Sequence, residues 1–164
     1  MKFPTAEQAL RWAYETQAKG NSTACSSLGA GRCPTSLDDR VNDKLMQAQS
    51  ILFMCERELT TLHAAYIKVQ FGREVEGMET LNSYVRNFDN LKGVKRRSID
   101  VIICAYCGER IGMQAMRRSL NCGMLKATNI RNSVYEILDG VHTDAMDTVY
   151  SLLHNKGLML KVIK

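Results

Sequence analysis

The chain has 164 residues, of which 45% are hydrophobic and 24% are charged, and its formal net charge is +5. This length and apolar content suffice for one ordinary domain, or two small subdomains, with a real core, which excludes disorder along the whole chain. Two prolines and few alternating apolar runs favour an all-α protein, because helices tolerate little proline and strands show period-two patterning.

The N-terminal residues lack the apolar run of a signal peptide, and the longest apolar stretch, residues 101–107, is far too short to cross a bilayer. We therefore expect a cytoplasmic protein with no membrane partner. In such a chain the six cysteines are expected to be reduced thiols that act as small core residues, not a disulfide framework.

The first 88 residues are expected to contain a first helix, a flexible loop, one long central helix and a short last helix. Thr5 and Gln8 match a capping box for a helix from about Pro4 to Lys19, and Gly20 would end it. Residues 20–36 are rich in glycine and serine, which predicts a loop. From residue 36 to residue 72, apolar residues alternate at spacings of four and three, which predicts one long helix of roughly 45–50 Å.

The long apolar seam has two interpretations. It is typical of the central helix of an antiparallel bundle, whose other helices cover the seam, and flanking apolar residues that widen the stripe favour this reading. The alternative is a coiled-coil homodimer.

A subdomain boundary is expected near residues 89–97, so that residues 1–88 and 89–164 form two parts. A short helix over residues 78–88 precedes it, and Ser98 is expected to cap a helix that carries several isoleucines. Residues 113–120 and 124–138 predict two short helices joined by a turn, and residues 143–154 predict a last helix with Gly157 as its C-cap. Residues 158–164 are expected to be extended.

Positive charge is concentrated in one region of the chain. Residues 92–131 hold nine basic residues against two acidic ones, a net charge of +7, so the rest of the chain is slightly negative. The run Lys95, Arg96 and Arg97 lies within it. A local field of this kind concentrates phosphates, which favours nucleic acid as a partner.

The two short helices in this region predict a helix-turn-helix-like C-terminal half that binds double-stranded DNA. Asparagine can pair with adenine, arginine with guanine, and threonine can contact the thymine methyl, while lysine binds phosphate. The outward residues of the second helix that carry this chemistry are Lys126, Thr128, Asn129, Arg131 and Asn132. Arg117 and Arg118 on the preceding helix suit backbone phosphates. The alternatives are RNA or protein contact, or a basic face that is simply solvated.

Scattered motifs support a family resemblance. They are Leu10-Arg11-Trp12, Ser26-Ser27-Leu28, Asp38-Asp39, Leu62-His63-Ala64-Ala65-Tyr66, Ala115-Met116-Arg117-Arg118 and Val134-Tyr135-Glu136-Ile137-Leu138. In these motifs the chain resembles the Q-type transcription antiterminators of lambdoid bacteriophages, in particular their small helical branch. The resemblance implies a DNA-binding transcription regulator of a bacterial host cell that engages RNA polymerase and sigma factor. It does not identify the polymerase-binding surface.

One short motif suggests metal binding. Cys104 and Cys107 form a CxxCG turn that can present two thiolates to zinc, and Cys122 follows fifteen positions later. His142 or His154 could complete a site, but these spacings match no standard finger. Two core thiols on a helix are therefore the favoured reading, with no cofactor expected and zinc kept as the alternative.

No arrangement of catalytic residues can be identified, so the chain is not expected to be an enzyme. Two classes of function remain. The first is a DNA-binding transcription regulator. The second is a helical adaptor that binds a protein partner through the long seam or the 20–36 loop, without reading nucleic acid.

Overall fold

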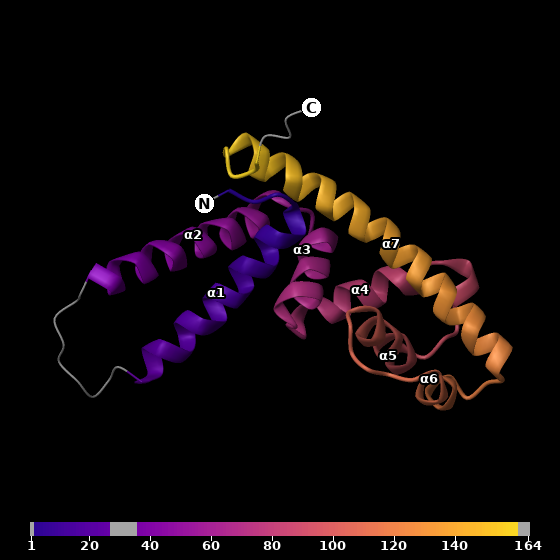
Figure 1. Ribbon diagram of the computed structural model, residues 1–164. Coiled ribbons are helices and arrows are strands. Elements are labelled where there is room, and N and C mark those ends of the chain that lie inside the picture. The colour runs from indigo at the N-terminus through magenta and orange to yellow at the C-terminus, as the bar shows by residue number, and fades with distance from the viewer. Residues whose placement is uncertain (1, 27–35, 161–164) are drawn as a thin grey trace. The chain divides into compact units, whose positions relative to one another are not determined.

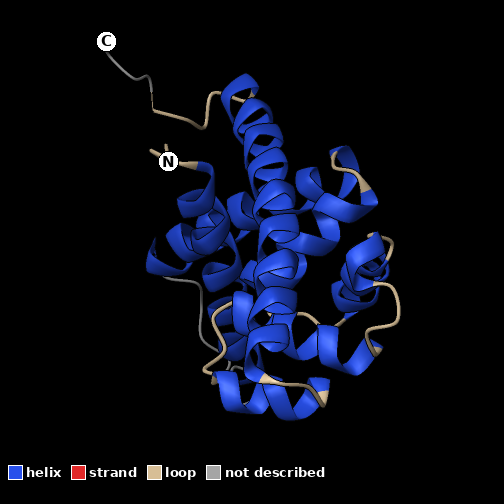
Figure 2. Ribbon diagram, turned by 90° about the vertical axis from the view of Figure 1, so that its right-hand side faces the viewer, coloured by secondary structure: helices blue, strands red, loops and turns tan. Residues whose placement is uncertain are grey.

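The computed structural model describes the backbone of residues 2–26 and 36–160 and the side chains of residues 2–20 and 41–160 (Figure 1). Over these residues the regular structure is helical and contains no strand (Figure 2), which confirms the all-α expectation. The elements are α1 (Ala6–Ser26), α2 (Ser36–Glu58), α3 (Thr61–Ile67), the π-helical turn η1 (Lys68–Gly72), α4 (Glu76–Arg86), the 3-10 turn η2 (Asp89–Leu91), α5 (Arg96–Tyr106), α6 (Met113–Leu120) and α7 (Met124–Asn155). None of the described helices is both long enough and apolar enough to cross a membrane.

Backbone contacts divide the chain into two compact units. Unit 1 comprises Met1–Leu59 together with Met146–Lys164, and unit 2 comprises Thr60–Ala145. This division differs from the boundary expected near residues 89–97. The difference arises because α7 is one helix whose last part contributes to unit 1, which sequence order alone does not reveal.

In unit 1, α1 and α2 pack along each other (Figure 1). Ala9, Ala13 and Ala48 are fully buried, which lets the two helices approach closely. Gly20 was expected to end the first helix, but it lies inside α1. A Cβ at Gly20 would come within 2.8 Å of a terminal methyl of Leu45, so this glycine serves close packing. Residues 20–26 of the predicted loop are therefore helical, and residues 27–35 lie outside the described structure.

The two ends of the described chain meet in unit 1. The Phe3 N–H donates to the Leu158 carbonyl at 2.8 Å, and the Leu160 N–H donates to the Phe3 carbonyl at 2.9 Å. The Thr5 hydroxyl accepts the Gln8 N–H at 3.2 Å, which confirms the predicted N-cap of the first helix. After α7, Gly157 adopts a φ of 69°, as expected of a C-cap. Of the predicted extended tail, residues 161–164 lie outside the described structure.

The predicted single helix over residues 36–72 is not confirmed. Helix α2 ends at Glu58, and α3 begins at Thr61. Between them Thr60 is extended, and its hydroxyl accepts the N–H of His63 at 3.2 Å. This hydroxyl satisfies one of the amides that a new helix start leaves open, so the break costs little. The residues of the predicted apolar seam are therefore divided between the units, with those up to Leu59 in unit 1 and those from Leu62 onward in unit 2.

The opposite correction applies to α7, where the two predicted helices over residues 124–138 and 143–154 form one helix of 32 residues. Gly140 lies in its interior, where glycine costs about 1 kcal/mol relative to alanine. The buried residues Leu138 and Val141 on either side keep the helix continuous, because their packing outweighs that cost.

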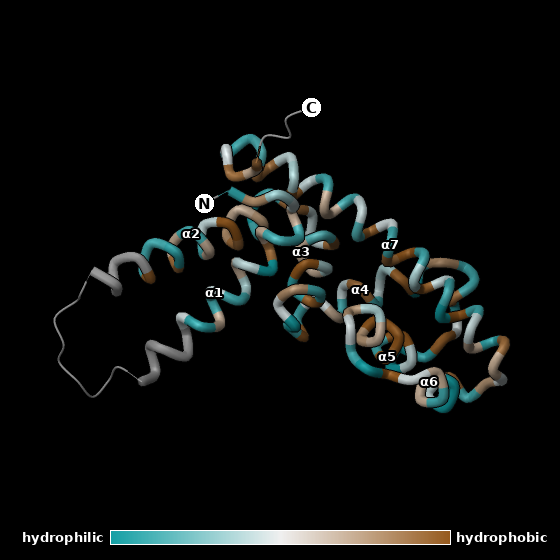
Figure 3. The backbone as a smooth tube through the Cα atoms, in the orientation of Figure 1, coloured by the Kyte–Doolittle hydropathy of each residue, from teal (hydrophilic) through white to brown (hydrophobic). Residues whose placement is uncertain are grey.

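The core of unit 2 centres on α5, whose apolar residues are brown in Figure 3. Ile99, Ile102 and Ile103 are fully buried, together with Leu81 on α4 and Leu138 on α7. A polar contact adds to this packing, since the Tyr66 hydroxyl lies 2.9 Å from Nδ1 of His142. Helix α5 was expected to be capped by Ser98, but it begins at Arg96 after an extended Lys95, with no side-chain cap.

Two glycines of unit 2 provide a matched test of this packing. A Cβ at Gly77 would lie 2.3 Å from the Ala65 carbonyl oxygen, whereas a Cβ at Gly140 would meet nothing within 4 Å. We expect Gly77→Ala to lower the free energy of unfolding by about 2 kcal/mol, because backbone must move. Gly140→Ala should raise it by about 0.5–1 kcal/mol. Urea denaturation followed by circular dichroism measures both, and equal effects of the two changes would contradict the α3–α4 contact.

Candidate nucleic-acid interface

The N-terminus of α5 carries the predicted basic run and is held in place by Asn82 of α4. The Asn82 side chain is only 1% exposed. Its amide nitrogen donates to the Arg96 carbonyl at 2.8 Å and to the Asp100 carboxylate at 2.6 Å. One buried amide therefore fixes both the first turn of α5 and the carboxylate that follows it.

Ser98 connects this turn to the end of α6. Its side chain is 2% exposed, and its hydroxyl donates to the Ser119 carbonyl at 2.8 Å. The Ser119 hydroxyl donates in turn to the Ser98 hydroxyl at 3.2 Å. Because Arg97 and Arg118 are the neighbours of these two serines in sequence, the contact brings the basic run of α5 close to the last turn of α6.

The cations at this junction are solvent-exposed. Lys95 is exposed just before α5, Arg96 and Arg97 are exposed in its first turn, and Arg117 and Arg118 are exposed on α6. Arg96 forms an ion pair with Glu79 of α4 at 3.2 Å. We use the term basic junction for Lys95, Arg96, Arg97, Arg117 and Arg118. Its concentration of positive charge is suited to an anionic partner.

Helix α6 and the start of α7 follow the predicted bounds, with a turn over residues 121–123. Asn121 adopts a left-handed conformation with φ of 49°. Its N–H donates to the Arg118 carbonyl, and the Cys122 N–H donates to the Arg117 carbonyl at 3.5 Å. Asparagine tolerates this conformation better than most residues, so a tight turn forms where glycine would be usual.

The start of α7 displays some of the predicted DNA-facing residues to solvent. Lys126, Asn129 and Asn132 are exposed, and Thr128 and Arg131 are partly buried. The Thr128 hydroxyl donates to the Met124 carbonyl at 3.0 Å. Val134 and Ala127 are fully buried on the inward face, as the sequence pattern predicted.

Arg131 does not share a side of α7 with Lys126. The two residues are five positions apart, which places them about 140° apart around the helix axis. The Arg131 guanidinium donates to the Asn132 side-chain oxygen at 3.2 and 2.8 Å, and it lies 5.7 Å from the centre of the Tyr135 ring. Of the five residues predicted to face DNA, Lys126 and Asn129 form an outward group, Arg131 and Asn132 form a pair that is already engaged, and the Thr128 hydroxyl is bound to the helix backbone.

The roles of three residues of this region were missed from sequence. Asn82 gave no recognisable signal, and Ser98 was expected only as a helix cap, because a buried polar residue on an amphipathic helix looks like an exposed one until its partner is known. Leu125 is 77% exposed beside the outward group. The sequence signal for the exposure of Leu125 was its position just after the turn and before Ala127, the first inward residue of α7.

The cysteine motif lies elsewhere in unit 2. Cys104 and Cys107 line a small pocket together with Glu109 and Met78. Burial, with the nearby Cys104 and Glu109 adding to it, raises the pKa of Cys107 to about 12, and burial chiefly raises the pKa of Cys104. Over the described parts of the chain, no three His, Cys, Asp or Glu side chains gather as a metal site.

We expect Asn82→Ala to lower the free energy of unfolding by about 1–3 kcal/mol, because it leaves the Arg96 carbonyl and the Asp100 carboxylate without this donor. Urea denaturation measures the change. Ser83→Ala, an exposed neighbour on α4, is the matched control and should stay within about 0.5 kcal/mol of wild type. Similar effects of both changes would show that Asn82 does not hold α5.

The raised thiol pKa values predict a pH dependence. Burial also raises the pKa of Cys55 to about 12. Between pH 9 and 12 the thiols of Cys107 and Cys55 therefore keep their protons in the folded chain, whereas the unfolded chain has released them. Their contribution to stability is therefore complete below pH 9 and is lost as the pH rises towards 12. At pH 9 both thiols should react with iodoacetamide at least about 100-fold more slowly than in urea-unfolded chain, measured by peptide mass spectrometry. Equal rates would contradict the burial.

Comparison of the chain with protein-family models, with curated proteins and with solved structures found no match. A function for this chain therefore has to be inferred from the geometry of the basic junction and of α7.

Proposed function

We propose that α5, α6 and the first turns of α7 bind double-stranded DNA. The observation that carries this proposal is the contact between Ser98 and Ser119, which joins the cationic ends of two helices within one folded unit. These hydrogen bonds bring together the two helix ends that carry Arg97 and Arg118, the sequence neighbours of the two serines.

The basic junction is suited to phosphates of the DNA backbone. Helix α5 begins with Arg96 and Arg97 directly after Lys95, and it has no side-chain cap, although cations are unfavourable near the positive end of a helix dipole. An anion bound at this end would be attracted by both the side chains and the dipole. Arg117 and Arg118 lie in the last turn of α6, where the negative end of the dipole favours them. Contacts of this kind position a protein on the duplex without reading sequence.

Base contacts are assigned to the outward group on α7. In a helix that enters the major groove, residues of its N-terminal turns reach the base edges. Asn129 carries the amide that pairs with adenine, and exposed Leu125 can contact a thymine methyl. Arg131 and Asn132 would join such contacts only after their mutual hydrogen bonds open.

The biological setting that we propose is transcription regulation without catalysis. This part of the proposal is supported by the motif resemblance to the Q-type antiterminators. It implies a DNA site near a late promoter, with RNA polymerase and sigma factor as further partners.

A salt titration of binding to a phage late-promoter duplex tests the phosphate contacts. Binding should weaken steeply with salt, and Arg117→Ala and Arg118→Ala should each reduce the slope of log K against log salt by about 1. Lys156→Ala, an exposed basic residue at the far end of α7, is the matched control and should leave the slope unchanged. Equal slopes for all variants would refute the basic junction as the phosphate contact.

Base readout is tested separately. Asn129→Ala should weaken binding to the preferred duplex by about 1–3 kcal/mol, with the loss confined to particular base pairs, because one bidentate pair is removed. Gel shifts against a set of single-base-pair variants measure this. A loss that is the same for every sequence would assign Asn129 to non-specific contact instead.

A further inference from the structure

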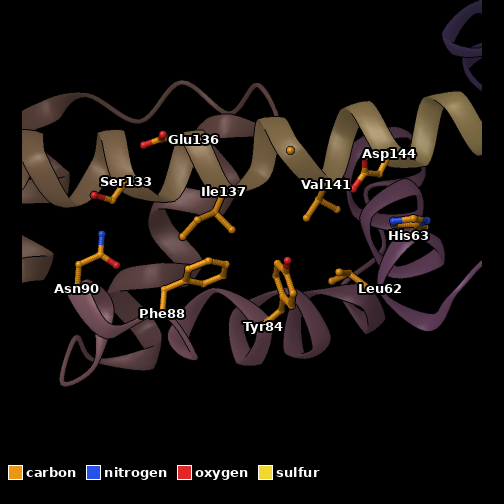
Figure 4. Close-up of a pocket in the computed structure, with 11 residues that line it drawn as sticks. Leu62, His63, Tyr84, Phe88, Asn90, Ser133, Glu136, Ile137, Val141 and Asp144 are labelled. Carbon is orange, nitrogen blue, oxygen red and sulfur yellow. The ribbon is translucent and has the colours of Figure 1, made fainter.

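A second surface of unit 2 has different chemistry from the basic junction. A groove of about 450 Å³ runs between α3, the end of α4 and the middle of α7. In Figure 4, Tyr84 and Phe88 form one wall, and Ile137 and Val141 face them from α7. The rings of Tyr84 and Phe88 pack edge to face at 5.6 Å, which fixes this wall.

The polar residues of the groove lie towards its ends. His63 and Asp144 lie at one end, and Asn90 and Ser133 lie at the other (Figure 4). Nδ1 of His63 is buried and has no hydrogen-bond partner. Glu136 adds a second carboxylate at the rim, while none of the lining residues is a lysine or an arginine. The groove is therefore acidic in a chain whose net charge is positive.

Gly140 is an independent sign that something approaches this groove. It lines the groove from the interior of α7, where glycine weakens a helix, and no other part of the described structure packs against it. The usual structural reason for such a glycine, close packing as at Gly77, is thus absent. A glycine of this kind leaves helix backbone open to close approach by another chain.

We propose that this groove binds an extended segment of a partner protein in which an arginine and an aliphatic residue lie two positions apart. Side chains two positions apart in an extended chain point the same way. The arginine would pair with Asp144, and the aliphatic side chain would enter between Phe88, Ile137 and Val141. Asn90 and Ser133 would hydrogen-bond the backbone of the segment, and the bare backbone at Gly140 would let it lie close to α7.

This proposal does not depend on DNA binding. The groove would repel phosphate, whereas the basic junction would attract it, so the two surfaces select opposite partners. The same chain could then hold a duplex and a basic protein segment at once.

The test uses a fluorescein-labelled peptide with the core Thr-Arg-Thr-Ile-Thr and the full chain, followed by fluorescence anisotropy. We expect the wild-type chain to bind it, and a peptide with Asp in place of Arg to bind at least tenfold more weakly. Asp144→Asn should weaken binding by about threefold to fivefold, because it removes one exposed ion pair. Asp147→Asn, an exposed carboxylate on the same helix outside the groove, is the matched control and should have no effect.

A blocking variant completes the test. Gly140→Leu adds a side chain where the structure has open space and favours the helix, so it should keep the fold while reducing peptide binding by more than tenfold. Circular dichroism checks the fold, and DNA binding by Asp144→Asn and Gly140→Leu should match wild type. Failure of the wild-type chain to bind the peptide at millimolar concentration would overturn the proposal, as would undiminished binding by both variants. A wild-type chain that binds the peptide but not the DNA duplex would contradict the DNA proposal alone.

Discussion

The arrangement of unit 2 depends on satisfying two buried polar side chains, Asn82 and Ser98, in an otherwise apolar interior. Apolar contacts between α4, α5 and α6 alone would tolerate small rotations and shifts, because they are not directional. The hydrogen bonds from Asn82 to the start of α5, and between Ser98 and Ser119, admit one geometry, and every other geometry leaves buried polar groups without partners. The position of the basic junction follows from that requirement.

Within unit 2, helix α7 carries a basic stretch at its start and an acidic stretch further along. Its first turns follow the basic junction and present Lys126 and Asn129, while residues further along the helix, from Ser133 to Asp144, line a groove with two carboxylates. The sequence distributes these charges along the helix as well as around it. A partner attracted to one stretch would be repelled by the other, so the two surfaces need no other device to keep their ligands apart.

What could be predicted from sequence was what depends on neighbouring residues. The bounds of α6, the turn after it, the Thr5 cap and the Gly157 cap all follow from patterns within a few positions. The break at Thr60 was missed because the apolar spacing continues across it, although a threonine is a common N-cap. The continuity of α7, the close packing at Gly20 and the buried roles of Asn82 and Ser98 depend on residues distant in sequence, such as Leu45 and Ser119, and no local pattern carries that information.

The pairing of Phe3 with residues 158–160 has a consequence for how the chain reaches its native state. Unit 1 is assembled from the two ends of the sequence, whereas unit 2 is a single uninterrupted stretch. During synthesis on a ribosome, residues 60–145 are complete before the last helical turns emerge, so unit 2 can mature first. Until residues 146–160 have also emerged, α1 and α2 lack the segment that completes their unit and pairs with Phe3, so unit 1 is necessarily the later of the two to be completed.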